Sequence, residues 1–293
     1  MGIRGFLMTG IIFFISSGVY AQRLRTSPTP LPSNEWSRVS DPTEGAPNSI
    51  GFYSAGCLAG ARTLPLDGVG YQVMKVFRNR YYGHSSLIEF ITRLGRSLDS
   101  AQEAMLIGDM AQPRGGPLPY GHASHQIGLD VDIWYWTHPD QRIRSLTLDE
   151  RNNTDMKTVL TPKGTVDPTL FTEATVSKLK FAATDPMVER IFVNPAIKKY
   201  LCAKLPASEH TWLHTLRPWP GHDNHFHVRL VCNSDSPQCV PQDPQSGGDG
   251  CSEVGVATEK NQDAEPESKI PPKVEELLSH SELPAVCRKI LKQ

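Results

Sequence analysis

The chain combines an apolar leader with six cysteines, and this combination constrains its fold more than any other feature of the sequence. Residues 1–21 resemble a secretory signal, with a basic Arg4, an apolar stretch from Phe6 to Ile15 and a cleavage site that ends at Ala21. The apolar stretch is about half as long as the ~20 residues that a membrane span requires. We therefore expect cleavage before Gln22, export of the chain, and no membrane span in the mature protein.

An even number of cysteines in an exported chain predicts three structural disulfides. A cysteine metal site would need close pairs such as Cys-x-x-Cys, and the closest pair here is seven residues apart. The sequence leaves the pairing open. The cysteines are Cys57, Cys202, Cys232, Cys239, Cys251 and Cys287.

The charge balance bears on the kind of partner. The chain carries 30 basic and 31 acidic side chains, and its formal net charge is −1. Bulk electrostatics therefore does not favour a polyanion, and we expect no nucleic-acid partner.

Composition divides the mature chain into three parts. Residues 22–48 are rich in proline and predict a surface arm, whereas residues 49–239 can supply a packed domain. Residues 240–293 have a low-complexity composition that cannot supply much core. Cys251 and Cys287 would tether this segment as a C-terminal wrap if both are paired.

Periodicity predicts a mixture of helices and strands. A capping box at Ser86 and Glu89 begins a helix whose apolar residues extend to Leu98, and a short buried strand follows at 104–107. A second helix is predicted at 173–183 and a strand at 190–193, and Asn194-Pro195 begins a third helix. The order shows no β-α-β rhythm, so the expected class is α+β.

Five of the ten histidines lie in two clusters. In the second cluster, His225 and His227 alternate with apolar residues, which predicts a strand with both rings on one side. Residues two apart on a strand are separated by about 7 Å, which suits one metal ligand beside one acid/base group. His222 precedes this strand.

In the first cluster, Asp132 lies on the polar side of an alternating strand that begins near Leu129, and His122 and His125 come from the preceding loop. A histidine, a carboxylate and a second histidine make three ligands with an open fourth position, the arrangement of catalytic zinc. Such an ion activates water and polarises a carbonyl. His-Glu-x-x-His is absent, so a thermolysin-like helix site is excluded.

These residues resemble a known family, the penicillin-insensitive murein endopeptidases. The resemblance is carried by residues 121–132, 222–229, 190–198, 71–74 and 248–251, and it extends from about Ser49 to Cys287. The family belongs to a wider group of zinc peptidases with lysostaphin-like enzymes and D-Ala-D-Ala dipeptidases, which share a small antiparallel sheet with the metal on one face. The resemblance therefore implies a small central antiparallel sheet, flanked by helices and disulfide-stapled loops.

The resemblance also implies a function and residue roles. The chain would be a periplasmic enzyme that cuts the D-alanyl to meso-diaminopimelyl cross-link of peptidoglycan. Zinc would be held by His125, Asp132 and His227, with His225 as the acid/base and His222 assisting it or steadying the oxyanion. The implied disulfides are Cys57 with Cys287, Cys202 with Cys251, and Cys232 with Cys239.

One departure from the family concerns a second metal ion. Some members carry a second ion held partly by the residue matching His122 and by an Asp and a His in a later loop. The best-aligned loop positions here are Pro162 and Thr165, which argues against a second ion. His122 is then expected to orient ligands or substrate, with a metal role as the alternative.

Several alternatives stay open at this point. A carboxypeptidase that trims a terminal D-Ala uses the same chemistry, and a peptidoglycan-binding protein without turnover could keep the same zinc site. Ser177 and Lys180 match the Ser-x-x-Lys motif of penicillin-binding proteins, but helical periodicity places both on a solvated surface. Asp109 could orient a histidine or simply end a strand, and Trp219 could line a cleft or pack.

Overall fold

The computed structural model describes residues 1–2, 31–245, 247–252, 254 and 283–293. The expected signal at 1–21 and most of the expected C-terminal wrap lie outside the described residues, apart from the parts of 240–254 and 283–293 just given. Residues from Pro32 onwards form one compact unit. Among the described residues, no helix has the length and apolar character to cross a membrane.

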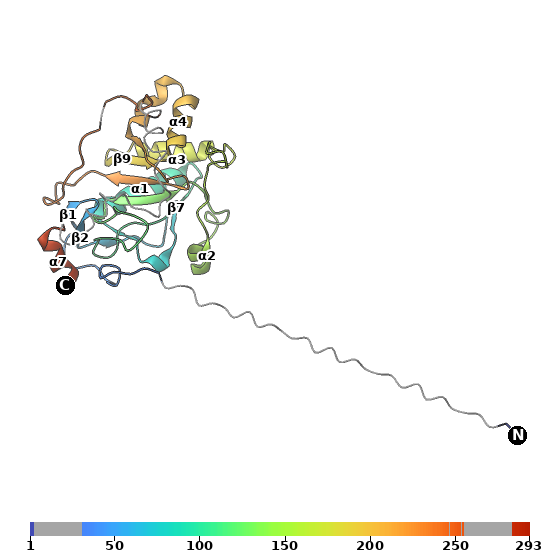
Figure 1. Ribbon diagram of the computed structural model, residues 1–293, viewed down its shortest axis with the longest axis horizontal. Helices are drawn as coiled ribbons and strands as arrows, with labels where there is room; N and C mark the ends of the chain where they lie inside the picture. The colour runs from blue at the N-terminus through green and yellow to red at the C-terminus, as the bar shows by residue number, and fades with distance from the viewer. Residues whose placement is uncertain (3–30, 246, 253, 255–282) are drawn as a thin grey trace. The chain divides into compact units, whose positions relative to one another are not determined.

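A seven-stranded sheet is the centre of this unit (Figure 1). Its middle consists of β9 (Val188–Val193), β11 (His225–Leu230), β8 (Asp130–Trp134) and β7 (Met105–Ile107), which pair antiparallel in that order. β10 (Leu216–Pro218) extends one edge, and β5 (Tyr71–Val73) with β4 (Asp67–Gly68) extends the other. The register sets His227 opposite Asp132, so the two sequence clusters meet on neighbouring strands.

This topology corrects two expectations. The sheet is larger than expected and mixed rather than antiparallel, and it contains crossover connections between parallel strands. β5 pairs parallel with β7, and α1 (Ser85–Ser100) lies between them in the chain. β9 pairs parallel with β10 through α4 (Pro195–Lys204) and the 3-10 helix η2 (Ala207–Thr215). Parallel neighbours need such crossovers, but strands of two or three residues are too short to show a period of two in the sequence.

The helices confirm the periodicity and correct one cap. α1 buries the predicted apolar face, and α3 (Glu173–Ala183) and the Asn194 cap of α4 occur where they are predicted. The capping box at Ser86 is wrong, because α1 begins at Ser85 and the side chain of His84 accepts the hydrogen bond from the Ser86 N–H. His84 therefore supplies the cap. It is buried, and its ring contacts Asn233 and Ser236 from a distant loop.

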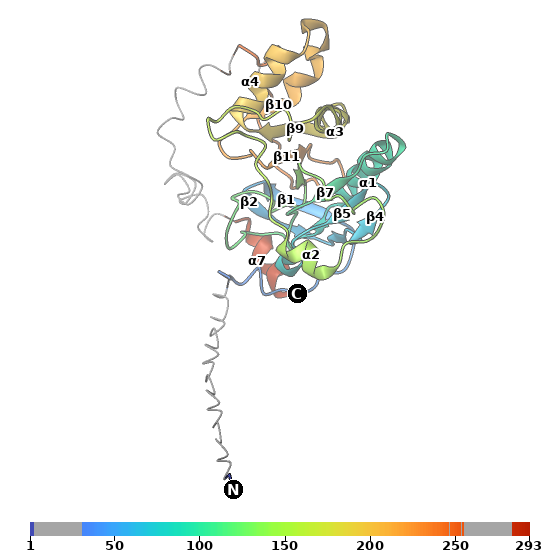
Figure 2. The ribbon, with the colours of Figure 1, turned by 90° about the vertical axis from the view of Figure 1, so that its right-hand side faces the viewer.

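Smaller elements surround the sheet. A hairpin is formed by β1 (Asn48–Phe52) and β2 (Ala55–Ala59), and a second pair by β3 (Arg62–Thr63) and β6 (Tyr82–Gly83). The 3-10 helix η1 (Val76–Arg78) and α2 (Leu148–Asn153) lie in the connections and contact each other, and Figure 2 shows α2. In the expected N-terminal arm, Trp36 is only 1% exposed and packs with Ile50 and Ile290.

Three disulfides join distant parts of the unit, and they are the pairs that the resemblance implies. Cys57 on β2 bonds Cys287 on α7 (Ala285–Lys292), which brings the end of the chain beside the β1–β2 hairpin in both views (Figures 1 and 2). The other pairs are Cys202 with Cys251 and Cys232 with Cys239. The described residues contain no free cysteine.

Candidate metal centre

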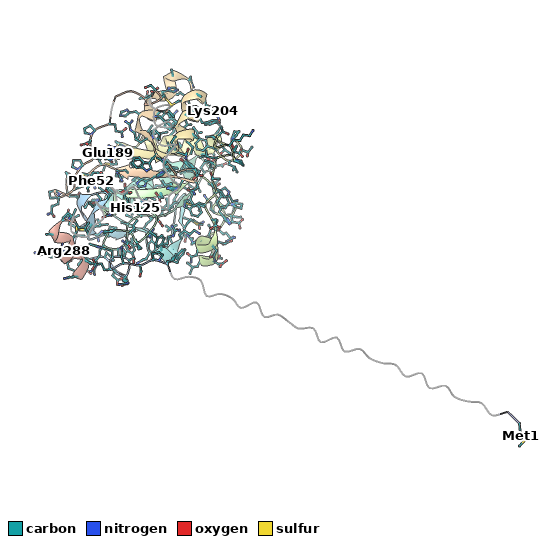
Figure 3. The ribbon with its side chains drawn as sticks, viewed as in Figure 1. Met1, Phe52, His125, Glu189, Lys204 and Arg288 are labelled. Atoms are coloured by element: carbon teal, nitrogen blue, oxygen red, sulfur yellow. A yellow bond between two sulfur atoms is a disulfide. The ribbon has the colours of Figure 1, made fainter. Side chains whose placement is uncertain are left out.

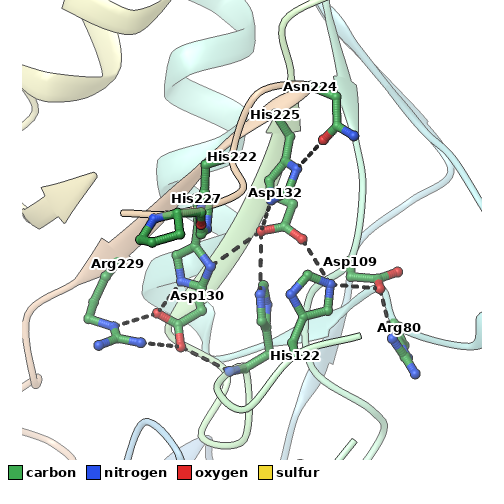
Figure 4. A network of polar contacts seen from close by, with 12 residues as sticks. Arg80, Asp109, His122, Asp130, Asp132, His222, Asn224, His225, His227 and Arg229 are labelled. Carbon is green, nitrogen blue, oxygen red and sulfur yellow. Dashed lines mark hydrogen bonds and ion pairs between the residues drawn. The ribbon is translucent and has the colours of Figure 1, made fainter. Parts of the chain in front are cut away.

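The centre gathers around the carboxylate of Asp132 on β8. Asp132 Oδ1 lies 3.4 Å from His125 Nε2 and 3.4 Å from His227 Nδ1, while Oδ2 lies 3.3 Å from His122 Nε2 (Figure 4). His225 Nε2 lies 3.6 Å from Asp132 Oδ1. The structure therefore brings side chains from both sequence clusters to one carboxylate.

Local backbone geometry places two of these histidines. His125 and His222 adopt left-handed φ angles of 68° and 52°, which residues other than glycine rarely adopt. His125 occupies its conformation with its backbone N–H donating to Asp130 Oδ2 at 3.0 Å. Such conformations persist only where the surrounding structure imposes them, and they concentrate at functional sites.

Several buried polar atoms of the centre have no hydrogen-bond partner, as expected of atoms that bind a cation. His125 is fully buried in the interior of the unit (Figure 3), and neither of its ring nitrogens makes a hydrogen bond. Asp132 Oδ1 is likewise buried without one. Buried polar atoms normally have partners, and a metal ion held by imidazole nitrogens and a carboxylate oxygen satisfies such atoms together.

The electrostatics of Asp132 and of His227 favours the forms that bind metal. Burial alone would raise the pKa of Asp132, but the charges of His225, His125 and His122 outweigh burial and hold it well below its usual range. Burial lowers the pKa of His227 to about 4, although Asp130 acts in the opposite direction. A charged carboxylate and a neutral imidazole are the states required of metal ligands.

Asp130 is a residue that the sequence reasoning missed. It is fully buried on β8, where Oδ1 accepts a 2.8 Å hydrogen bond from Arg229 Nε and lies 3.1 Å from His227 Nε2. Because Nε2 of His227 faces Asp130, Nδ1 is the nitrogen directed at Asp132. Asp130 therefore orients a candidate ligand. The sequence could have indicated Asp130, because a residue two positions before Asp132 on a strand lies on the same face.

Asp109 has the first of its two predicted roles, because it contacts a histidine of the centre. Its Oδ2 lies 3.3 Å from His122 Nε2 and accepts hydrogen bonds from Arg78 and Arg80. Burial acts to raise the pKa of Asp109, but the hydrogen bond with His122 and the two arginine charges hold it far below its usual range. His122 thus lies between two charged carboxylates, and its own pKa is raised by Asp132 and Asp109 against the effect of burial.

His225 and His222 are neighbours at the centre, and the ring of His222 lies 6.2 Å from that of Phe192 on β9. His225 Nδ1 is 2.7 Å from Asn224 Oδ1, and its ring centroid is 5.0 Å from that of His222. Burial and the nearby histidines lower the pKa of His222 to about 3, so its imidazole is neutral at pH 7. Trp219 is 57% exposed and its ring contacts Phe192, whose own ring contacts His227, so Trp219 flanks the centre rather than packing in the core.

Other candidate residues lie elsewhere. Thr165 bonds Thr161 across the Leu160–Val166 bridge, and Pro162 lies in the same loop. Ser177 and Lys180 are exposed on α3, which confirms the solvated interpretation of the Ser-x-x-Lys motif. His280 lies outside the described residues.

A second group of metal-ligand residue types, His210, Asp249 and Cys251, occurs where residues 247–251 meet α4 and η2. We call this group, together with Lys198 and the Cys202–Cys251 disulfide, the anchor. His210 Nδ1 is 2.8 Å from Asp249 Oδ2, and its Nε2 is 3.0 Å from the Leu205 carbonyl oxygen. Because Cys251 is oxidised and both nitrogens of His210 have partners, this group offers no open ligand set.

The fold and the centre together define a mixed α/β protein with a buried histidine–carboxylate site of the kind that supports hydrolysis. Comparison with known proteins identifies the family. Residues 49–292 match the sequence model of the penicillin-insensitive murein endopeptidases. The chain belongs to this family, and it is a peptidase.

Three curated relatives named penicillin-insensitive murein endopeptidase illustrate the similarity. The protein of Haemophilus influenzae is 41% identical over 252 residues, which cover 84% of this chain and 83% of the relative. That of Yersinia enterocolitica is 45% identical over 225 residues, covering 75% and 79%. That of Pectobacterium atrosepticum is 41% identical over 257 residues, covering 87% and 88%.

Proposed function

We propose that this protein is a zinc-dependent D,D-endopeptidase that hydrolyses the D-alanyl to meso-diaminopimelyl cross-link of peptidoglycan in the periplasm. The observation that carries the proposal is the buried Asp132 carboxylate, whose Oδ1 lies 3.4 Å from both His125 and His227, while His125 and Asp132 Oδ1 make no hydrogen bonds. The ligand atoms of His122, His125 and Asp132 also lie within 4.8 Å of one another. The names of the relatives supply the polymer. The leader at 1–21 supports export by a cleavable signal.

His125, Asp132 and His227 would hold the ion, with one ion expected. Two imidazoles and one carboxylate leave a fourth position open, which is the donor set of catalytic zinc. When bound, zinc supplies a water of lowered pKa and polarises the scissile carbonyl. Asp130 orients His227, and Asp109 with Arg80 holds His122 beside Asp132.

The remaining histidines perform the proton chemistry in this proposal. Asn224 Oδ1 accepts the Nδ1 hydrogen of His225, so Nε2 is the basic nitrogen, which would take a proton from the attacking water and return it to the leaving amine. His222 is neutral at pH 7, and its Nδ1–H donates to the Pro220 carbonyl oxygen at 3.0 Å, so its Nε2 is a proton acceptor and His222 assists His225 rather than steadying the oxyanion. His122 acts by positioning.

The test is mass spectrometry of purified cross-linked muropeptide dimers after incubation with the protein as purified, after chelation, and after zinc is restored. Conversion of dimers to monomers that chelation abolishes and zinc restores is the expected result. Loss of a single D-Ala from monomers would instead indicate a carboxypeptidase. Intact dimers in all three arms, with retained binding to peptidoglycan, would indicate a binding protein and overturn the proposal.

A further inference from the structure

The centre contains a second buried carboxylate, Asp130, which contacts two of the proposed zinc ligands. Its Oδ1 lies 3.1 Å from His227 Nε2, and its Oδ2 accepts the backbone N–H of His125 at 3.0 Å (Figure 4). Arg229 supplies the opposite charge, with Nε 2.8 Å from Oδ1 and Nη2 3.4 Å from Oδ2. The positions of both ligands therefore depend on how the pair of Asp130 and Arg229 is held.

Arg229 is itself held by two rings and one amide. Its Cζ lies 4.1 Å from the centroid of the Tyr53 ring and 5.1 Å from that of Phe192. Such cation–π contacts attract the charge but set no direction for the individual N–H groups. Nη1 donates to Gln242 Oε1 at 2.7 Å. This directional bond sets the rotation in which the guanidinium presents Nε and Nη2 to Asp130.

The backbone holds Gln242 in place from both sides. Before it, residues 238–240 exchange two backbone hydrogen bonds of 2.9 and 3.0 Å with Gly51 on β1. After it, the carbonyl oxygen of Asp243 accepts a hydrogen bond of 2.7 Å from Arg190 Nη2 on β9. The amide of Gln242 is therefore presented to Arg229 by a segment that is fixed independently of the centre.

Gln245 gives an internal comparison three residues further along. It is half-buried like Gln242, and its Oε1 accepts a hydrogen bond from Arg217 Nε at 2.7 Å. Its Nε2 donates to the carbonyl oxygen of Glu189. These contacts attach the segment to β10 and β9 rather than to Asp130. The two glutamines thus make the same kind of bond to an arginine, and only the bond of Gln242 leads to the ligands.

We propose that Gln242 is a positioning residue of the metal centre, which acts through the pair of Arg229 and Asp130. Its Oε1 fixes the guanidinium, the guanidinium fixes the carboxylate, and the carboxylate orients the ring of His227 and the backbone of His125. The inference rests on the proposed function, because it takes these two histidines as zinc ligands. It gives the start of the C-terminal wrap a part in building the centre.

The first arm of the test measures zinc affinity by competition with a chromophoric chelator. Gln242→Met keeps the length of the side chain and removes the acceptor, and we expect zinc to bind about 10-fold more weakly, the lower end of the losses caused by residues behind metal ligands. Gln242→Glu keeps an acceptor oxygen, and Gln245→Met is the matched control. Both should bind zinc within about twofold of the native protein.

The second arm uses chelated protein and does not require zinc to bind. Nuclear magnetic resonance of protein labelled with ¹⁵N-histidine follows the Nε2–H of His227, which faces Asp130 and is assigned by its loss in His227→Ala. We expect this hydrogen to exchange with water about 10-fold faster in Gln242→Met, because its hydrogen bond to a charged group is weakened. The exchange should be unchanged in Gln242→Glu and in Gln245→Met.

The outcomes separate this inference from the proposed function. Native zinc affinity and native exchange in Gln242→Met, or equal losses in Gln242→Met and Gln245→Met, would overturn the inference. Gln242→Asn, whose amide is one methylene too short, should show the same losses and replaces Gln242→Met if that variant does not fold. Variants that follow the expected order in both arms, beside a native protein that leaves muropeptide dimers intact, would overturn only the proposed function.

Discussion

The metal centre and the anchor contain the same kinds of residue and use them in opposite ways. In the anchor, His210 has a partner at each ring nitrogen, and Cys251 is bonded to Cys202. In the centre, His125 is buried with neither ring nitrogen hydrogen-bonded. A histidine beside an aspartate therefore indicates nothing by itself, whereas the completeness of its hydrogen bonding separates a structural clip from a site prepared for a ligand.

The largest expected difference between the two regions is in activity. His125→Ala removes a proposed ligand and should lower cleavage of muropeptide dimers at least about 100-fold, which exceeds the loss from most residues that only orient ligands. His210→Ala should leave activity within about twofold. Dimer cleavage and bound zinc by elemental mass spectrometry provide the measurement. Equal losses in the two variants would contradict the distinction.

The second difference concerns stability and should favour the anchor. Replacing Cys202 and Cys251 by serine opens a link between residues 49 apart and should lower the free energy of unfolding by about 4 kcal/mol. Opening Cys232–Cys239, which are seven residues apart, should cost about 2–3 kcal/mol. Urea denaturation of both double variants is the measurement. A larger loss at the short loop would show that loop entropy does not govern these links.

A third difference is in the sign of the pH dependence. Burial lowers the pKa of His227 to about 4 from 6.5, so metal-free protein keeps this contribution above pH 6.5 and loses it as pH falls towards 4. The hydrogen bond with Asp249 raises the pKa of His210, so its contribution is present below pH 6.5 and is lost as pH rises through the raised value.

Urea denaturation of chelated protein from pH 8 to pH 4 tests these signs. His227→Ala should flatten the acid side of the stability profile, whereas His210→Ala should flatten the alkaline side. The two variants should therefore change opposite limbs. A change on the same limb in both variants would refute the assigned directions.

The smallest expected effect lies outside both regions. Ser177→Ala on the exposed face of α3 should change the free energy of unfolding by no more than about 0.5 kcal/mol and leave cleavage unchanged. Acylation of the protein by a radiolabelled β-lactam is the complementary measurement, and none is expected. Labelling that Ser177→Ala removes would revive the Ser-x-x-Lys interpretation.

The sequence predicted helices correctly where the periodic pattern extends over several turns or where the capping residue is adjacent to the helix in the sequence. α3 spans the predicted residues, and Asn194 caps α4 as its Asn-Pro pair indicates. The cap of α1 was wrong because His84 gains its role from Asn233 and Ser236, which are far away in the sequence. β4, β5 and β10 were missed because strands this short contain less than two full alternations.

The candidate site was predicted in part for the same reason. His125, Asp132 and His227 were named from spacing and resemblance, and the structure brings them together. Asp130 was missed because its importance depends on Arg229, 99 residues further along the chain. The burial of Lys178 was missed as well, since a lysine on an amphipathic helix gives no sign that it is buried.

The sequence by itself determined where the longer helices and strands lie, which residues can supply ligands, and that the cysteines form an even set. These properties depend on neighbours a few residues apart, where alternation and capping act. Only the tertiary structure decided that the sheet has seven strands in mixed orientation and that Asp130 orients His227. It also decided that both Lys178 and Lys198 are buried, with three carbonyl acceptors around Lys198 Nζ and one distant carbonyl oxygen near Lys178 Nζ. These outcomes depend on burial and hydrogen-bond competition among residues far apart in the chain, which no local pattern records.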